Sequence, residues 1–252
     1  MHAKSVCRSA LMLSSYQFDP SVAVRLPVQS ENDAKALLQL VKVSDVQRAS
    51  IEQFIASGFA KAYQADVHSF MPNLLGVSRS GEWQAVLGLR CAATPTAQGS
   101  VKTHLFIEHY LPAAVEQVLA EQGIHAERSQ LIEIGHLYAI NRQSLLQLFV
   151  LMAYALDQLN YRYLLCAATT QVRSILSRHG IELTELGEAK AEALGEDAAS
   201  WGSYYDTNPK VCVMDLAAMT GLIHSDEKLT ALAHQHWPQL HQLVARLPEG
   251  DC

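Results

Sequence analysis

The sequence predicts an α/β (α+β) protein whose central sheet is mixed and flanked by helices. The first observation is the stretch 130–180, where an apolar run at 131–140, a helical apolar stripe at 145–159 and a second apolar run at 161–168 follow one another. A strand–helix–strand unit of this kind has a right-handed crossover and joins two parallel neighbouring strands. The second observation is the Ser80-Gly81 turn dipeptide between two apolar segments, which predicts an antiparallel hairpin.

The remaining elements follow from local patterns along the chain. A short helix opened by Thr170 and closed by Gly180 carries ordinary start and stop signals. Strands are expected at 22–28, 105–111 and 211–216, helices at 31–43, from Ser50, after Pro112 and in the tail, and a polar loop at 94–99. An N-acetyltransferase-like fold has this order of elements.

The chain divides into one domain, residues 20–216, and a C-terminal helical tail, residues 217–252. Apolar residues of the tail recur at amphipathic spacing in one or two helices that are broken at Pro238. The tail is expected to pack on the domain or on a partner subunit, which leaves a homodimer open. Because its polar face is not basic, a membrane-surface role is the weaker alternative.

The composition is that of an ordinary globular protein. Of the 252 residues, 49% are hydrophobic and 17% are charged, and the formal net charge is −6. This charge and the lack of a Lys/Arg-rich block argue against nucleic acid as a partner. An acidic surface would suit a cationic acceptor such as an amine, although solubility alone explains it equally well.

The spacing of the cysteines and the length of the apolar runs bear on the cellular compartment of the protein. The five cysteines show no C-x-x-C spacing, so Cys91 and Cys166, which lie in apolar runs, are expected to be core thiols. The N-terminal apolar run at 10–13 is too short for a signal-peptide core, and no stretch is long enough to cross a bilayer. We therefore predict a cytoplasmic protein without an integral membrane segment.

Five short motifs stand in order along the chain: Arg48-x-x-Ile51-Glu52-x-Phe54-Ile55, Phe70-Met71-Pro72-Asn73-Leu74-Leu75, Leu105-Phe106-Ile107-Glu108-x-Tyr110-Leu111, Glu133-Ile134-Gly135-x-Leu137 and Trp201-Gly202-Ser203-Tyr204-Tyr205. In these motifs the chain resembles the bacterial thermostable hemolysin family over roughly residues 45–216. That family is similar in pattern to the GNAT acyltransferases and to the acyl-homoserine-lactone synthases. The resemblance implies a GNAT-like acyl-CoA N-acyltransferase fold and acyl transfer from a pantetheine thioester to a small-molecule amine.

The resemblance also implies where the thioester donor binds. In GNAT-like sheets two parallel strands splay apart, and their exposed backbone groups pair with the pantetheine arm. In this chain those segments would be 137–140 and 163–167, and a backbone N–H near Tyr138 would bind the oxyanion. The donor-binding residues implied are Leu137, Tyr138, Ala139, Ile140, Arg142, Gln143 and Ser144, which include a helix N-terminus where an anion can sit.

Two positions depart from the family pattern. GNAT enzymes carry glycines in the pyrophosphate loop where this chain has Asn141 to Leu146, and side chains there would crowd a backbone that must approach phosphate closely. His136 stands where the family pattern favours Asn. The resemblance therefore implies either an acyl-CoA or an acyl-carrier-protein thioester as the co-substrate. No metal is expected, because the tail histidines His234, His236 and His241 lack a further ligand pattern.

Two carboxylates in apolar runs are the candidate catalytic groups. Glu133 is predicted to be the base or the amine anchor, because burial raises the pKa of a carboxylate towards useful values. Glu108 has the same ambiguous setting. The alternative for Glu133 is a structural ion pair with an arginine such as Arg90 or Arg128. If both carboxylates face one cleft, they favour a cationic acceptor such as a polyamine.

The aromatic run 201–206 is predicted to line the acceptor pocket. Trp201, Tyr204 and Asp206 are expected to bind the substrate, and Tyr205 is expected to give a proton to the leaving thiolate. The alternative is a set of aromatic anchors that hold a loop on the core. His136 is a further substrate-binding candidate, although a histidine with a purely structural role is the commoner outcome.

Three classes of function follow. The first is an enzyme that moves an acyl group, expected to be a fatty acyl group, onto an amine, with a homoserine-lactone-synthase-like use of S-adenosylmethionine as a close variant. The second is a membrane-active lytic protein, against which the absence of a spanning segment and of a basic amphipathic helix speaks. The third is a GNAT-like protein that binds an acyl ligand without catalysis.

Overall fold

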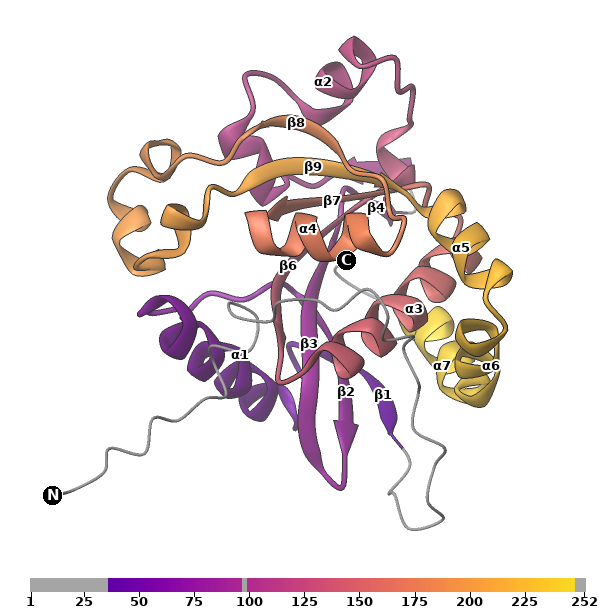
Figure 1. The fold of residues 1–252 in the computed structure, drawn as a ribbon. Helices are drawn as coiled ribbons and strands as arrows, with labels where there is room; N and C mark the ends of the chain where they lie inside the picture. The colour runs from indigo at the N-terminus through magenta and orange to yellow at the C-terminus, as the bar shows by residue number, and fades with distance from the viewer. Residues whose placement is uncertain (1–35, 97–98, 248–252) are drawn as a thin grey trace, which may run out of the picture.

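The strand patterns produce a seven-stranded sheet in the computed structural model, which describes residues 36–96 and 99–247 (Figure 1). The strand order is β1-β2-β3-β6-β7-β9-β8, and every neighbouring pair is antiparallel except β6–β7. A separate hairpin pairs β4 with β5. The strands are β1 (Leu37–Lys42), β2 (Asn73–Arg79), β3 (Glu82–Cys91), β4 (Ala93–Thr96), β5 (Gly99–Lys102), β6 (Leu131–Ala139), β7 (Tyr163–Ala168), β8 (Thr184–Glu188) and β9 (Lys210–Asp215).

Helices cover both faces of this sheet (Figure 1). On one face α3, α4 and the tail helices α5 to α7 form the larger core, and on the other face α1 and α2 cover separate halves. The helices are α1 (Arg48–Tyr63), α2 (Val115–Glu121), α3 (Arg142–Gln158), α4 (Thr170–Arg178), α5 (Leu216–Ser225), α6 (Glu227–Gln235) and α7 (Trp237–Arg246). Four short 3-10 helices are η2 (Phe106–Tyr110), η3 (Arg128–Gln130), η4 (Ala191–Trp201) and η5 (Tyr204–Thr207).

The strand–helix–strand unit predicted from residues 130–180 is confirmed. β6 and β7 are parallel neighbours, and α3 crosses between them. Every residue of α3 from Ser144 to Leu156 except Leu146 is buried, because the helix lies between the sheet and the tail helices. Its first turn is capped by Asn141, whose Oδ1 accepts a hydrogen bond of 2.8 Å from the Ser144 N–H.

A β-bulge in β6 reorients the second half of the strand. The register against β3 shifts between Val86 and Gly88, and His136 has a φ of +51°, in the left-handed region. Because of the extra residue, the side chains of β6 after the bulge point to the opposite faces of the sheet from those that an unbroken alternation would give. Tyr138 therefore packs with α1, while Leu137 and Ala139 face the core around α3.

β6 and β7 form a ladder only at their beginnings. Leu131 to Ile134 pair with Tyr163 to Cys166, and no pairing follows. Beyond this point β6 stays with β3 as far as Ala139, and β7 stays with β9 as far as Ala168. The two strands therefore diverge towards their carboxyl ends, as Figure 1 shows.

Three predicted elements are wrong, and one lies outside the described residues. The segment 31–43 is predicted to be a helix, but it contains the strand β1. Leu38 and Leu40, two residues apart, both face the core, and the strand pairs with β2. The loop predicted at 94–99 contains residues of the β4–β5 hairpin. The strand predicted at 105–111 is the 3-10 helix η2, in which the backbone N–H groups of Phe106 and Ile107 turn towards Glu133. The strand predicted at 22–28 lies outside the described part.

Glu108 belongs to a buried ion-pair network. Both of its carboxylate oxygens accept hydrogen bonds from Arg128, at 2.7 and 2.8 Å, and Arg128 also binds Glu116. The Leu105 and Val115 backbone N–H groups donate to the same carboxylate. Burial alone would raise the pKa of Glu108, but the hydrogen bonds from Arg128 and the backbone lower it to about 2. Glu108 therefore joins η2, α2 and η3.

We expect Gly58→Ala in α1 to destabilise the fold by about 1–3 kcal/mol, because over-packing a core costs this much. A Cβ atom at Gly58 would lie 2.5 Å from the Tyr138 ring. The matched control is Gly221→Ala in α5, where a Cβ meets nothing within 4 Å and the gain in helix propensity is about 0.5–1 kcal/mol. Urea unfolding of both variants checks the prediction, and equal effects would contradict it.

We expect Glu108→Gln to destabilise the protein by about 3 kcal/mol at pH 7, because Arg128 loses a buried partner. Since the pKa of Glu108 is lower in the folded chain, its contribution to stability is present above about pH 4.5 and is lost as the pH falls towards 2. The variant and the wild type should therefore converge in acid. Unfolding between pH 3 and 7 measures this. The control is Glu82→Gln at an exposed position, expected within about 0.5 kcal/mol of wild type.

Candidate active site

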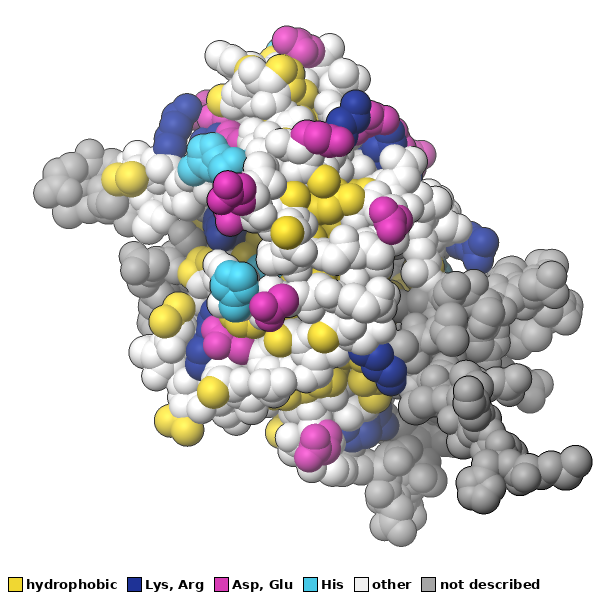
Figure 2. Space-filling model, turned by 90° about the vertical axis from the view of Figure 1, so that its left-hand side faces the viewer, with side chains coloured by type: hydrophobic (Ala, Val, Ile, Leu, Met, Phe, Trp, Pro, Cys, Tyr) yellow, Lys and Arg dark blue, Asp and Glu magenta, His cyan; other side chains and the backbone are white. Residues whose placement is uncertain are grey.

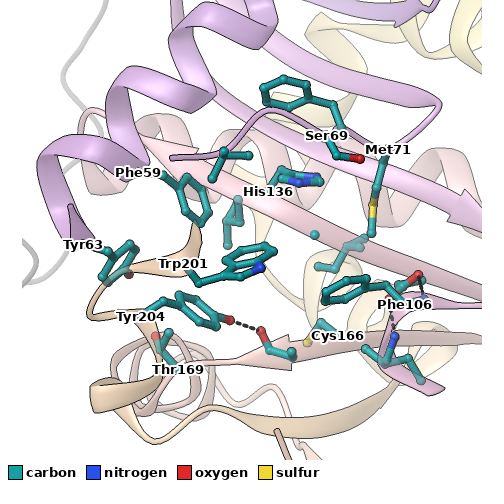
Figure 3. Close-up of a pocket in the computed structure, with 18 of the residues that line it drawn as sticks. Phe59, Tyr63, Ser69, Met71, Phe106, His136, Cys166, Thr169, Trp201 and Tyr204 are labelled. Carbon is teal, nitrogen blue, oxygen red and sulfur yellow. Dashed lines mark hydrogen bonds between the residues drawn. The ribbon is translucent and has the colours of Figure 1, made fainter. Parts of the chain in front are cut away.

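A cavity of about 530 Å³ lies where β6 and β7 diverge (Figure 3). Its walls include Gly135, His136 and Leu137 from β6 and Cys166 to Thr169 from β7. The carboxyl end of α1 and the loop after it, η2, α3, α4 and η4 complete the walls. This volume is in the range of small-molecule sites. The predicted crevice between the Glu133 strand and the Cys166 strand is therefore present.

Glu133 lies at the closed end of this crevice, where the two strands are still paired. Its side chain is 1% exposed, and its two oxygens accept hydrogen bonds from the backbone N–H groups of Phe106 (2.9 Å) and Ile107 (2.8 Å). The Arg90 guanidinium is 3.5 Å from the nearer oxygen. Burial raises the pKa of Glu133 to about 7, although these N–H groups and Arg90 favour the charged form. Its carboxylate can therefore take up a proton near neutral pH.

His136, the bulge residue, also lines the cavity. Its ring centroid lies 5.6 Å from that of Phe70. The Trp201 ring, which Figure 3 shows next to it, is 6.4 Å away, centroid to centroid. Burial and the charge of Arg90 lower the pKa of His136 to about 4, so the ring is neutral at pH 7. Its Nδ1 atom is buried and has no hydrogen-bond partner within the described part of the chain. A ligand that donates a hydrogen bond would satisfy it.

Trp201 is held in the cavity by the docking of its loop on α1. The Ser203 N–H and hydroxyl both donate to the Tyr63 carbonyl, and the Asp66 N–H donates to the Ser200 carbonyl. Gly202 has a φ of +53°, and a Cβ there would meet the Tyr63 carbonyl oxygen. The Trp-Gly-Ser sequence thus anchors the loop and directs the indole ring inwards.

The tyrosines of this loop have different positions. Tyr204 lines the cavity, and its hydroxyl donates to the Ala167 carbonyl of β7 at 3.0 Å. Tyr205 does not line the cavity, and its hydroxyl is 2.7 Å from that of Tyr110, which does. Burial raises the pKa of all three hydroxyls, which therefore stay protonated. Asp206 is exposed and lies outside the cavity wall.

Only part of the predicted donor segment reaches the cavity. Leu137 lines it, whereas Tyr138 packs against Phe54 of α1 and Ala139 pairs with β3. Ile140, Arg142, Gln143 and Ser144 lie outside the cavity wall. On β7, Tyr163 to Cys166 are occupied by pairing with β6, so the gap begins beyond Cys166. The structure thus brings Glu133, His136, Leu137, Trp201 and Tyr204 together and leaves Glu108 in its ion-pair network.

Several wall residues were not among the predicted site residues. Met71 fills the space above two glycines, since a Cβ at Gly88 or Gly135 would lie 2.8 or 2.7 Å from its side chain. Arg48 fixes this loop by donating to the Met71 and Pro72 carbonyls. Asp66, Glu196 and Asp197 come from polar loop segments in which no local pattern distinguishes them from other surface acids.

The described part of the chain has neither a metal-binding cluster nor a membrane-spanning helix. Within residues 36–96 and 99–247, no group of three or more His, Cys, Asp or Glu side chains is arranged to hold a metal ion. In the same part of the chain, every helix is too short or too polar to span a bilayer.

Comparison with solved structures shows the fold. TofI in an apo form is 14% identical and covers 77% of this chain and 99% of its own, with a TM-score of 0.51. TofI in a ternary complex with an inhibitor and MTA is 13% identical with the same coverages and a TM-score of 0.50. The acyl-homoserine-lactone synthase LasI is 12% identical and covers 73% of this chain and 91% of its own, with a TM-score of 0.49. The predicted GNAT-like mixed sheet with one splayed parallel pair is confirmed.

Comparison with sequences assigns the family. A search of curated proteins finds no match. A model of the family described as thermostable hemolysin matches residues 41–220, which is well over half of the chain. The chain therefore belongs to the thermostable hemolysin family, as its five motifs predicted.

Proposed function

We propose that this protein transfers an acyl group from a pantetheine thioester to the amine of a small molecule. The observation that carries the proposal is the gap between β6 and β7, with a buried carboxylate at its closed end. β3 occupies the outer edge of β6 and β9 that of β7, so the edges beyond Ile134 and Cys166 face the gap without a strand between them. An extended arm with two amide groups, such as pantetheine, fits between such edges.

The cavity offers the two environments that the reaction needs. On the α3 side its wall is apolar, with Leu137, Phe149 and Leu176, which suits a fatty acyl chain. On the α1 side it holds Glu133, His136 and the aromatic rings of the loop. A thioester that enters through the gap would have its carbonyl near the bulge of β6.

In the proposed reaction, the acceptor nitrogen attacks the thioester carbonyl carbon. The new C–N bond forms, the C–S bond breaks, and the thiolate leaves. Glu133 takes the proton that the amine loses, directly or through one water molecule, and passes it to the thiolate, so the carboxylate is regenerated. A backbone N–H group at the β6 bulge is the candidate donor of a hydrogen bond to the oxyanion.

The donor is proposed to be an acyl carrier protein rather than free CoA. The first N–H groups of a helix bind phosphate when they are unpaired, and at the α3 N-terminus the Asn141 side chain already accepts from one of them, the Ser144 N–H. The segment 141–146 also contains no glycine. The likeness to TofI in fold is compatible with either donor.

The direct test is mass spectrometry of the purified protein with mixtures of acyl-CoA or acyl-carrier-protein thioesters and amines. We expect an N-acyl product whose formation depends on the protein. If every thioester is left unconsumed, the enzyme proposal is wrong. Lysis of red cells by lipid-free protein that Glu133→Gln does not affect would favour direct lytic action instead.

We expect Glu133→Gln to lower kcat by about 10²–10⁴-fold, because general base catalysis contributes this much. The amide nitrogen would face a backbone N–H of η2, so circular dichroism should accompany the kinetics. Glu133→Asp retains a carboxylate and should keep more activity than the Gln variant. A folded Gln variant with wild-type kcat would exclude Glu133 as the base.

The pH dependence follows from the raised pKa of Glu133. The carboxylate accepts a proton only when it is ionised, so kcat/KM should rise as the pH increases through about 7 and then level off. His136 is already neutral in this range, because its pKa is lowered to about 4. The rate profile from pH 5 to 9 measures this, and a midpoint unchanged by Glu133→Asp would argue for another group.

A further inference from the structure

The end of the cavity beneath η4 is walled by three carboxylates. Asp66 comes from the loop after α1, and Glu196 and Asp197 come from η4, which the Asp66–Ser200 backbone hydrogen bond holds against that loop. All three side chains are exposed, and none forms an ion pair with a described residue. On the face that carries the β8–β9 connection, Asp and Glu side chains are scattered among Lys, Arg and His side chains (Figure 2).

Several carboxylates elsewhere in the described chain have cationic partners. Glu108 and Glu116 share Arg128, and Glu188 binds both Lys190 and Lys210. Among the described residues that line the cavity, the only Lys or Arg is Arg90, which is next to Glu133. The negative charge beneath η4 is therefore available to a cationic ligand.

Inside these carboxylates the wall is aromatic. The Trp201 ring lies within 5.3 to 6.4 Å, centroid to centroid, of Phe59, Phe106, His136 and Tyr204. In Figure 3 the indole lies between the rings of His136 and Tyr204. Aromatic faces attract ammonium groups, and the attraction grows when the site is partly dry. The indole and the carboxylates thus favour the same kind of charge.

His136 provides an observation that is independent of the acidic residues. Its buried Nδ1 atom has no partner among the described residues. In a neutral ring, Nδ1 accepts a hydrogen bond when the proton is on Nε2. A ligand with an N–H group would satisfy this atom. A carboxylate of the ligand, by contrast, would be repelled by Asp66, Glu196 and Asp197.

We propose that the acyl acceptor is a diamine or polyamine. Its distant ammonium group lies between Trp201 and the carboxylates of Asp66, Glu196 and Asp197, and its reacting amine extends towards Glu133, with an N–H donated to His136 Nδ1. This inference rests on the proposed function and specifies its acceptor. Zwitterionic amino acids and S-adenosylmethionine, which carry a carboxylate, are the competing acceptors.

The test compares cadaverine with n-pentylamine, which has the same chain length and one amine, and with S-adenosylmethionine. With the thioester that the protein consumes, we expect at least a fivefold higher kcat/KM for cadaverine. The Glu196→Gln/Asp197→Asn double variant should raise KM for cadaverine at least fivefold, with kcat within twofold and n-pentylamine unaffected. Glu192→Gln, on the same η4 segment but outside the cavity wall, is the matched control.

Equal rates with both amines, a preference for S-adenosylmethionine, or an unchanged KM in the double variant would overturn the inference while leaving acyl transfer intact. If no thioester is consumed, the proposed function fails, and calorimetric titration of cadaverine alone decides the inference. Binding that the double variant loses and the control keeps supports a cationic ligand, and absence of binding refutes it.

Discussion

The structure depends on the incomplete ladder between β6 and β7. Four residue pairs hold the parallel strands together, and then β3 keeps one strand while β9 keeps the other. Both strands remain paired on their outer edges, so the divergence leaves no strand without support. Beyond the four pairs, β6 and β7 form no backbone hydrogen bonds with each other, and a ligand between them can pair with the free backbone groups instead. A cavity that crosses the sheet is the direct consequence.

The bulge at His136 and the loop at Met71 shape the opened strand. The positive φ of His136 shifts the alternation, so that His136 and Tyr138 both face α1. Gly88 and Gly135 leave room for Met71, and the Arg48 guanidinium holds the carbonyls of that loop. The three features together fix the β6 backbone where a thioester carbonyl would lie.

Glu133 has two roles, one in holding the fold together and one in the proposed chemistry. The Phe106 and Ile107 N–H groups donate to its two oxygens, so this carboxylate ties η2 to the sheet. The same burial raises its pKa to about 7, which is the property a general base requires. Both alternatives considered from the sequence are present, since Glu133 forms an ion pair with Arg90 at 3.5 Å while burial still raises the pKa of its carboxyl group to about 7.

The sequence alone determined the parts that local periodicity controls. The strand–helix–strand unit and the Ser80-Gly81 hairpin were predictable, because apolar spacing and turn residues report local backbone geometry. Glu133 and Glu108 were not distinguishable, because each is a lone carboxylate in an apolar run. Tertiary structure separated them by bringing Arg128 to Glu108 and two backbone N–H groups to Glu133. Only the tertiary structure brought the carboxylates beneath η4 together. The Asp66–Ser200 backbone hydrogen bond that does so joins residues more than 100 positions apart, and such a contact leaves no periodic signal in the sequence.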